Sequence, residues 1–152
     1  MRVAVGVDHA GFPLKAPVIA DLQQHGHEVI DLGGDGTDPG DDYPDYSKAV
    51  AHAVQSGQAE RAVLICGSGV GASVAANKVR GVRAALCHDL FSARQGVEDD
   101  DINVLCLGAR VIGADQAVAL VNAYMDARFS GLERHARRLA KVNQMEEEFC
   151  KS

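Results

Sequence analysis

A cysteine followed by three closely spaced glycines is the part of this sequence whose residue types and spacing point most directly to chemistry. Cys66 ends an apolar run that begins at Arg61, and residues 67–71 read Gly-Ser-Gly-Val-Gly before a stretch of small apolar residues begins. The run predicts a buried strand and the stretch predicts a helix, so bare backbone N–H groups would surround the thiol at a helix N-terminus. Such a loop can hold an anion or a developing oxyanion, and a thiolate beside it can act as a base or a nucleophile.

Simpler interpretations of this loop stay open at this point. Buried cysteines are common in protein cores, and a glycine-rich turn between a strand and a helix needs no ligand. The spacing of Gly67, Gly69 and Gly71 is G-x-G-x-G, not the G-x-G-x-x-G of dinucleotide-binding loops. We favour a binding loop, because the thiol and the bare amides coincide.

The elements that must position this loop alternate along the chain. Short apolar runs predict strands at 3–7, 28–32, 62–65, 83–87 and 104–107, and helical patterns lie at about 13–25, 46–56, 70–79, 90–95, 114–128 and 132–149. This order predicts an α/β fold: a Rossmann-like, doubly wound three-layer αβα sandwich on a five-stranded parallel sheet of order 2-1-3-4-5. Its ligand crevice, where strands 1 and 3 diverge, would receive Asp8 and His9 from one strand and Cys66 from the other.

Composition excludes several classes of function. The 152 residues fit a single domain, and a net charge of −6 argues against binding to nucleic acid or to a membrane surface. Four cysteines without a CxxC pair favour free thiols in a reducing cytoplasm. An aromatic content of 5% without tryptophan disfavours a flavodoxin-like cofactor binder. The acidic run Glu98–Asp101 is expected to lie on a loop and to hold no metal, because adjacent carboxylates seldom converge on one ion.

Several segments, in their order and spacing, resemble the type B ribose-5-phosphate isomerases and the related galactose-6-phosphate isomerase subunits. The resemblance covers nearly the whole chain. It rests on Val7–Phe12, Asp42–Tyr46, Cys66–Gly71, Ala75–Lys78, Gly81–Ala84, Asn103–Leu105, Gly108–Arg110 and Arg134-His135.

The resemblance implies a cofactor-free aldose–ketose isomerase that works through a cis-enediolate. Cys66 would move a proton between C1 and C2, and Ser68 would assist proton transfer between O1 and O2. The resemblance also implies a homodimer, or a tetramer, with shared active sites, in which the last helix packs on or reaches toward a partner subunit. The remaining residues would bind the phosphorylated sugar: Asp8, His9, Tyr43, the loop amides of Gly67, Gly69, Val70 and Gly71, and Asp100, Asn103, Arg110, Arg134, His135 and Arg138.

One position departs from the family pattern. Aligned on Asn103, the family's ring-opening histidine falls at position 99, where this chain has Asp99. An ionised aspartate is a poor proton donor near neutral pH unless neighbouring acids raise its pKa. Either Asp99 still opens the sugar ring, or the substrate needs no opening, as for a four-carbon aldose phosphate.

Three interpretations of function therefore remain. The first is a ribose 5-phosphate isomerase. The second is an isomerase of another aldose phosphate with six or four carbons. The third is a non-catalytic module that binds a phosphosugar or a nucleotide. Without a phosphate ligand, Arg134 and Arg138 would be an ordinary basic stripe on one helix face.

Overall fold

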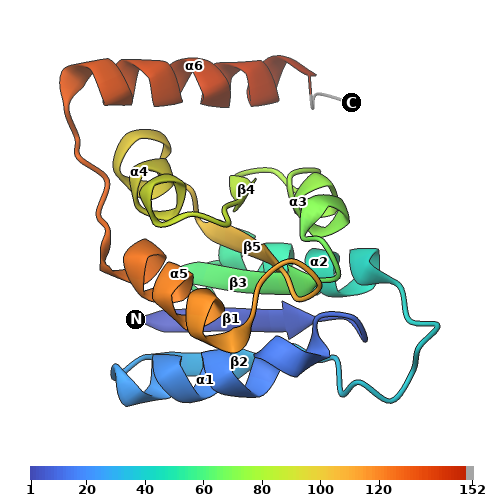
Figure 1. Ribbon diagram of the computed structural model, residues 1–152. Coiled ribbons are helices and arrows are strands. Elements are labelled where there is room, and N and C mark those ends of the chain that lie inside the picture. The colour runs from blue at the N-terminus through green and yellow to red at the C-terminus, as the bar shows by residue number, and fades with distance from the viewer. Residues whose placement is uncertain (150–152) are drawn as a thin grey trace.

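A single five-stranded parallel sheet organises the protein, and the computed structural model describes residues 1–149 (Figure 1). The strands are β1 (Arg2–Val7), β2 (Glu28–Asp31), β3 (Arg61–Cys66), β4 (Ala84–Leu86) and β5 (Val104–Gly108). They lie in the order β2-β1-β3-β5-β4. The predicted α/β class is confirmed, but the predicted order 2-1-3-4-5 is wrong in its last two positions.

Burial explains why β5, not β4, lies beside β3. Strands β3 and β5 are buried along their whole length and pair from Ala62 opposite Val104 to Cys66 opposite Gly108. Strand β4 has three residues, none of them fully buried, which suits the edge of a sheet. The longer, wholly apolar strand therefore takes the interior place.

Helices cover both faces of the sheet. The 3₁₀ helix η1 (Phe12–Leu14), α1 (Lys15–Gln24), α4 (Leu90–Asp100) and α5 (Ala114–Asp126) pack on one face, where Val5, Ile65 and Leu107 point into the core. Helices α2 (Tyr43–Gln55) and α3 (Val70–Ala76) cover the other face over Leu64 and Cys106. This arrangement is the expected three-layer sandwich.

Helix α6 (Glu133–Phe149) lies apart from these layers, across the top of Figure 1. His135 is its buried residue, whereas Val142, Met145 and Phe149 are exposed apolar side chains. The chain reaches α6 by an extended segment in which the Ser130 N–H donates to the Glu98 carbonyl at 2.9 Å. Within residues 1–149, no helix is long and apolar enough to cross a membrane. Cys150 lies outside the described residues.

The acidic run differs from its expected loop. Glu98, Asp99 and Asp100 form the last turn of α4, which extends to residue 100 rather than 95. Asp101 follows as the C-cap with a left-handed φ of 51°. The helix continues because Ile102 packs back against Gly96 and the Asp101 N–H donates to the Val97 carbonyl at 3.1 Å.

Candidate active site at the ends of strands β1 and β3

The carboxyl ends of β1 and β3 border a cavity of about 200 Å³. Val7 lies opposite Ile65 in the sheet, and the Asp8 N–H donates to the Ile65 carbonyl at 3.2 Å, so the two strands deliver their next residues to the same point. The cavity is lined by Asp8, His9, Ala10, Tyr43, Cys66, Gly67, Ser68, Gly71 and Arg110. All of these residues except Ala10 were candidates in the sequence.

The thiol of Cys66 is nearly buried and borders this cavity. Its Sγ accepts a hydrogen bond from the Gly69 N–H at 3.1 Å, because the loop turns back at Gly69 with a left-handed φ of 80°. A cysteine that acts as a base on carbon needs access to the substrate and a hydrogen-bond donor at its sulfur. Cys66 has both, because it borders the cavity and receives the Gly69 N–H.

The other two described thiols have no such setting. Burial raises the pKa of Cys87 to about 11, and burial also raises the pKa of Cys106. Both side chains are packed in the core clusters. They are core residues, as their apolar neighbours in the sequence indicated.

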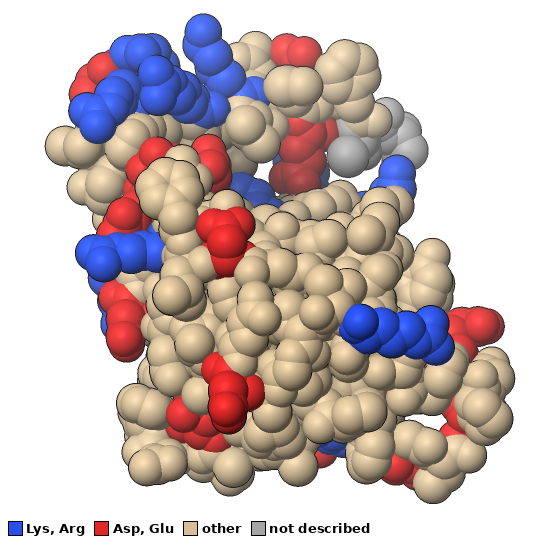
Figure 2. Space-filling view, viewed as in Figure 1, with Lys and Arg blue, Asp and Glu red and all other residues tan. Residues whose placement is uncertain are grey.

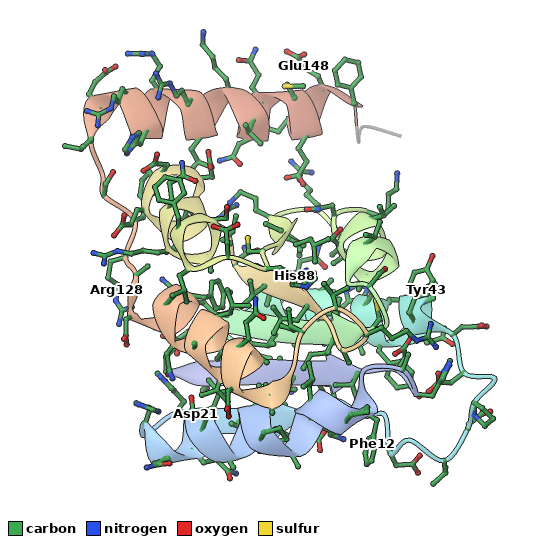
Figure 3. The ribbon with its side chains drawn as sticks, in the orientation of Figure 1. Phe12, Asp21, Tyr43, His88, Arg128 and Glu148 are labelled. Carbon is green, nitrogen blue, oxygen red and sulfur yellow. The ribbon has the colours of Figure 1, made fainter. Side chains whose placement is uncertain are left out.

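Tyr43 closes one side of the cavity because the opposite residue has no side chain. A Cβ on Gly71 would lie 2.7 Å from the Tyr43 Cζ, so only glycine lets the ring approach. Tyr43 begins α2 and lies at one end of the sheet in Figure 3, with 41% of its surface exposed. Ser68 is exposed, and its hydroxyl accepts a hydrogen bond from the Val70 N–H at 3.2 Å.

Charged groups enter the cavity from β1 and β5. Asp8 is buried and accepts a hydrogen bond from the Gly11 N–H at 2.8 Å. Arg110 reaches the cavity because β5 lies next to β3: its N–H donates to the Gly67 carbonyl at 3.0 Å. Its guanidinium lies over Gly67, where an added Cβ would be 3.1 Å from the Arg110 Nη1. The cavity thus combines a thiol, a carboxylate and a cation.

His9 is held by a residue that sequence reasoning missed. Its Nδ1 lies 2.6 Å from Asp41 Oδ1, which also accepts from the His9 backbone N–H at 3.1 Å. Asp41 lies in the Gly/Asp-rich loop 33–42, and several acidic residues there gave no signal as to which one would turn inward. Asp8, His9 and Asp41 also form the one group among residues 1–149 whose ligand atoms lie close enough to share a metal ion.

Asp99 and His135 lie together, but not at the cavity. Asp99 Oδ2 accepts from Gln95 Nε2 at 2.7 Å, and Asp99 Oδ1 lies 3.5 Å from His135 Nε2. His135 Nδ1 in turn lies 2.6 Å from the Ser130 hydroxyl. Within one protomer this cluster joins the start of α6 to α4.

The other expected sugar contacts are also elsewhere within the described protomer. Asn103 accepts from the Arg83 N–H at 2.8 Å and donates to the Gly81 carbonyl at 2.9 Å, which secures the turn before β4. Asp100 borders a separate hollow of about 380 Å³ between α6 and the body. Arg134 and Arg138 are exposed on the first turns of α6, where Figure 2 shows basic side chains gathered at the upper left.

Comparisons with known proteins agree with the fold. Residues 3–142 match the model of the ribose/galactose isomerase family. The chain is 41% identical to ribose-5-phosphate isomerase B of Escherichia coli over 96% of this chain and 97% of that protein. It is also 41% identical to D-erythrulose-4-phosphate isomerase of Pectobacterium atrosepticum, over 86% of each. The structure of Clostridium thermocellum ribose-5-phosphate isomerase B superposes with a TM-score of 0.94 at 44% identity, covering 98% of this chain and 99% of that one.

The chain belongs to the ribose/galactose isomerase family. It is therefore an enzyme of the aldose–ketose isomerase class, which moves hydrogen between neighbouring carbons of a phosphorylated sugar.

Proposed function

We propose that the enzyme interconverts ribose 5-phosphate and ribulose 5-phosphate, with Cys66 as the base. The observation that carries this proposal is the Cys66 thiol, which borders a small cavity and accepts a hydrogen bond from Gly69. Removal of a proton next to a carbonyl needs a positioned base and donors for the resulting oxyanion. The loop after β3 offers both within a few residues.

Proton transfer through Cys66 and Ser68 accounts for the whole isomerisation. The Cys66 thiolate takes the C2 proton of the open-chain aldose, the C–H electron pair forms the C1–C2 double bond, and the carbonyl electrons move to O1. A proton passes from O2 to O1 with the help of the Ser68 hydroxyl. The Cys66 thiol then returns its proton to C1, which gives the ketose and restores the thiolate. Asp8 would bind sugar hydroxyls, and His9 and Arg110 would attract the phosphate.

The position of α6 supports a homodimer with shared sites. Arg134 and Arg138 lie outside the cavity of their own protomer. They belong to an arm formed by residues 132–149, on which Leu132, Val142 and Met145 are exposed. Exposed apolar residues on an arm of this kind favour burial against a second copy. In this proposal each α6 brings its arginines to the partner's substrate, and Asp100 and Asn103 face the shared boundary. The free thiols favour a reducing cytoplasm.

The decisive experiment follows isomerisation by NMR in deuterated water. Ribose 5-phosphate is tested beside aldose phosphates of four and six carbons, and incorporation of deuterium reports proton transfer at the carbon. Cys66→Ala should lower turnover by roughly 10²–10⁴-fold, the usual contribution of a general base. The matched control is Cys87→Ala, which removes a thiol that burial keeps protonated. Equal turnover in the two variants would rule out Cys66 as the base.

A four-carbon substrate is a second candidate, because of Asp99. Asp99 already engages Gln95 and His135, and a four-carbon aldose phosphorylated at its terminal hydroxyl cannot close a furanose ring. One relative with 41% identity is named for D-erythrulose 4-phosphate. A tetrose phosphate turned over faster than ribose 5-phosphate would favour this candidate.

Asp99→His separates the two candidates further. A large gain in ribose 5-phosphate turnover would show that ring opening limits the native enzyme. If turnover of ribose 5-phosphate is high in the native enzyme and does not rise in the variant, Asp99 serves in the place of the histidine.

A further inference from the structure

We propose that Asp41 is a positioning residue that fixes the His9 imidazole, so that Nε2 is the ring nitrogen presented to the phosphate of the substrate. The proposal deepens the proposed function, since it assigns how the phosphate end of that same cavity is built. It rests on a chain of contacts that runs from loop 33–42 to the end of β1.

Asp41 contacts two nitrogen atoms of His9. Its Oδ1 accepts from the His9 backbone N–H at 3.1 Å and lies 2.6 Å from the ring Nδ1. The Asp41 side chain is 10% exposed and that of His9 is 30% exposed, so the pair is sheltered while the ring still borders the cavity. One carboxylate therefore sets both the backbone turn after β1 and the orientation of the ring.

A second contact fixes the Asp41 carboxylate itself. The Tyr46 hydroxyl donates to Asp41 Oδ2 at 3.0 Å. Burial opposes the charge of Asp41, but the hydrogen bonds from His9 and Tyr46 outweigh it and lower the pKa of this carboxyl. The hydrogen bond to Asp41 raises the pKa of Tyr46, which stays a donor.

The charge of Asp41 decides the state of the ring. An ionised carboxylate can only accept hydrogen bonds, so the proton in the short contact must reside on His9 Nδ1. Nε2 is then the atom left for a ligand. If Nε2 is also protonated, the ring adds a positive charge to the cavity that Arg110 also lines.

The loop that carries Asp41 is itself held at its start. Lys15 Nζ donates to the Gly34 carbonyl at 2.7 Å and lies 2.9 Å from Asp31 Oδ1. Gly34 has a left-handed φ of 84°, and a Cβ there would collide with the Val7 carbonyl oxygen. The loop thus presses on the end of β1 and returns Asp41 to His9, one residue beyond Asp8.

The first test needs no variant of Asp41. Long-range ¹H–¹⁵N correlation spectra of the native enzyme report which ring nitrogen is protonated, and the His9→Gln spectrum assigns the signal by its loss. We expect His9 to carry its proton on Nδ1, alone or together with Nε2. A neutral ring protonated only at Nε2 would overturn the proposal, because Asp41 could not then accept from it.

The second test removes the carboxylate. Asp41→Ala should raise the KM for the sugar phosphate and the Kd for inorganic phosphate roughly tenfold or more, with kcat within about threefold, since partners that orient a histidine are typically worth 10–100-fold. The matched control is Asp38→Ala: Asp38 lies on the same loop, and its side chain accepts from the Gly40 N–H at 2.9 Å, within that loop. Asp41→Asn, which keeps an acceptor, should recover part of the affinity.

The comparison between the Asp41→Ala and Asp38→Ala variants decides the proposal. Equal phosphate affinity in the two variants would overturn it. If Asp41→Ala fails to fold, Asp41→Asn and Tyr46→Phe take its place, and unchanged affinity in both would overturn the proposal equally. Phosphate affinity and the ring spectrum are measured without turnover, so they stand even if no sugar phosphate is isomerised. Failure of the proposed function is therefore distinguishable from failure of this inference.

Discussion

The cavity and helix α6 are built in opposite ways. The cavity is closed by contacts within one protomer: strand pairing sets Asp8 beside Cys66, and β5 brings Arg110 to the Gly67 carbonyl. Helix α6 leaves from the other end of the sheet, near Arg128 in Figure 3, and lies over the body with most of its surface exposed. The cavity is lined by residues of one protomer, whereas most side chains of α6 are exposed.

In the proposed mechanism this difference separates two tasks. Proton transfer needs precisely placed atoms, and the buried sheet would supply that precision at Cys66. Holding a phosphate needs charge at a distance from the reacting carbons, which a projecting arm can supply to a neighbour. We expect variants of the two regions to fail differently.

The largest effect should come from the arm. Arg134→Ala combined with Arg138→Ala should lower kcat/KM by about 10²–10⁴-fold, because each charge-assisted hydrogen bond to phosphate is worth about 1.5–3 kcal/mol. The fold should be unaffected, since both side chains are exposed. Steady-state kinetics and thermal unfolding of the same sample measure the two effects.

Mixing variant subunits tests which protomer supplies the arginines to each active site. Equal amounts of Cys66→Ala and the double arginine variant, unfolded and refolded together, should regain roughly a quarter of native activity, because half of the dimers are mixed and each has one complete site. Activity no higher than the sum of the separate variants would mean that each cavity depends on its own α6, or on neither.

The next effect lies where the two regions join. Arg61 is buried and donates to the carbonyls of Tyr124 at 2.6 Å and Ala127 at 2.8 Å, so it closes the end of α5 from which the arm departs. Arg61→Met should lower the free energy of unfolding by about 2–4 kcal/mol, because buried carbonyls lose their donors. Denaturant titration measures this loss, and Arg94→Met, on the exposed Arg94–Glu98 pair, is the control with little expected change. Equal stability in both variants would show that this end of α5 contributes nothing.

The sequence predicts the self-contained region better than the arm, for a physical reason. Strand and helix patterns follow from local periodicity, and the convergence of Asp8 and Cys66 follows from parallel strands that end at one edge. The order of β4 and β5 depends on which of two apolar runs is longer and more deeply buried, a comparison made only when the sheet assembles. Arg110 joins the cavity through that order.

Side chains that act through long-range contacts are the hardest to assign from the sequence. Asp41 is one of several acidic residues in a loop, and nothing local distinguishes it until His9 lies opposite. Asn103 fits a family motif, yet within the protomer its side-chain amide hydrogen-bonds to Gly81 and Arg83 in the turn before β4. The roles of Arg134, His135 and Arg138 remain predictions that depend on a second chain.

A smaller effect should appear in the pH dependence of stability, at the carboxyl end of β5. The Gly108 N–H donates to His88 Nε2 at 3.0 Å, and burial lowers the pKa of His88 below 6.5. The unfolded chain therefore takes up this proton more readily, so stability is full above pH 6.5 and falls as pH drops toward the lowered folded-state pKa. His88→Gln, whose carbonyl can still accept, should lose less stability between pH 7.5 and 5.5 than the native protein, with His52→Gln as an exposed control. An unchanged pH dependence in His88→Gln would exclude His88 as the source.

The smallest effect should come from the contact that ties the far end of α6 to its own body. The Glu146 carboxylate accepts from the Gly81 N–H at 3.0 and 3.1 Å, at a half-exposed position on the rim of the hollow beneath the helix. Glu146→Gln should change the free energy of unfolding by no more than about 1 kcal/mol, because an exposed hydrogen bond exchanges readily with water. Activity should stay near native, since Arg134 and Arg138, which we propose bind the phosphate, lie on the first turns of the same helix. A loss of activity as large as that of the arginine variant would mean that α6 must be held against its own protomer to work. The contrast between a cavity lined within one protomer and a helix that serves the partner would then no longer hold.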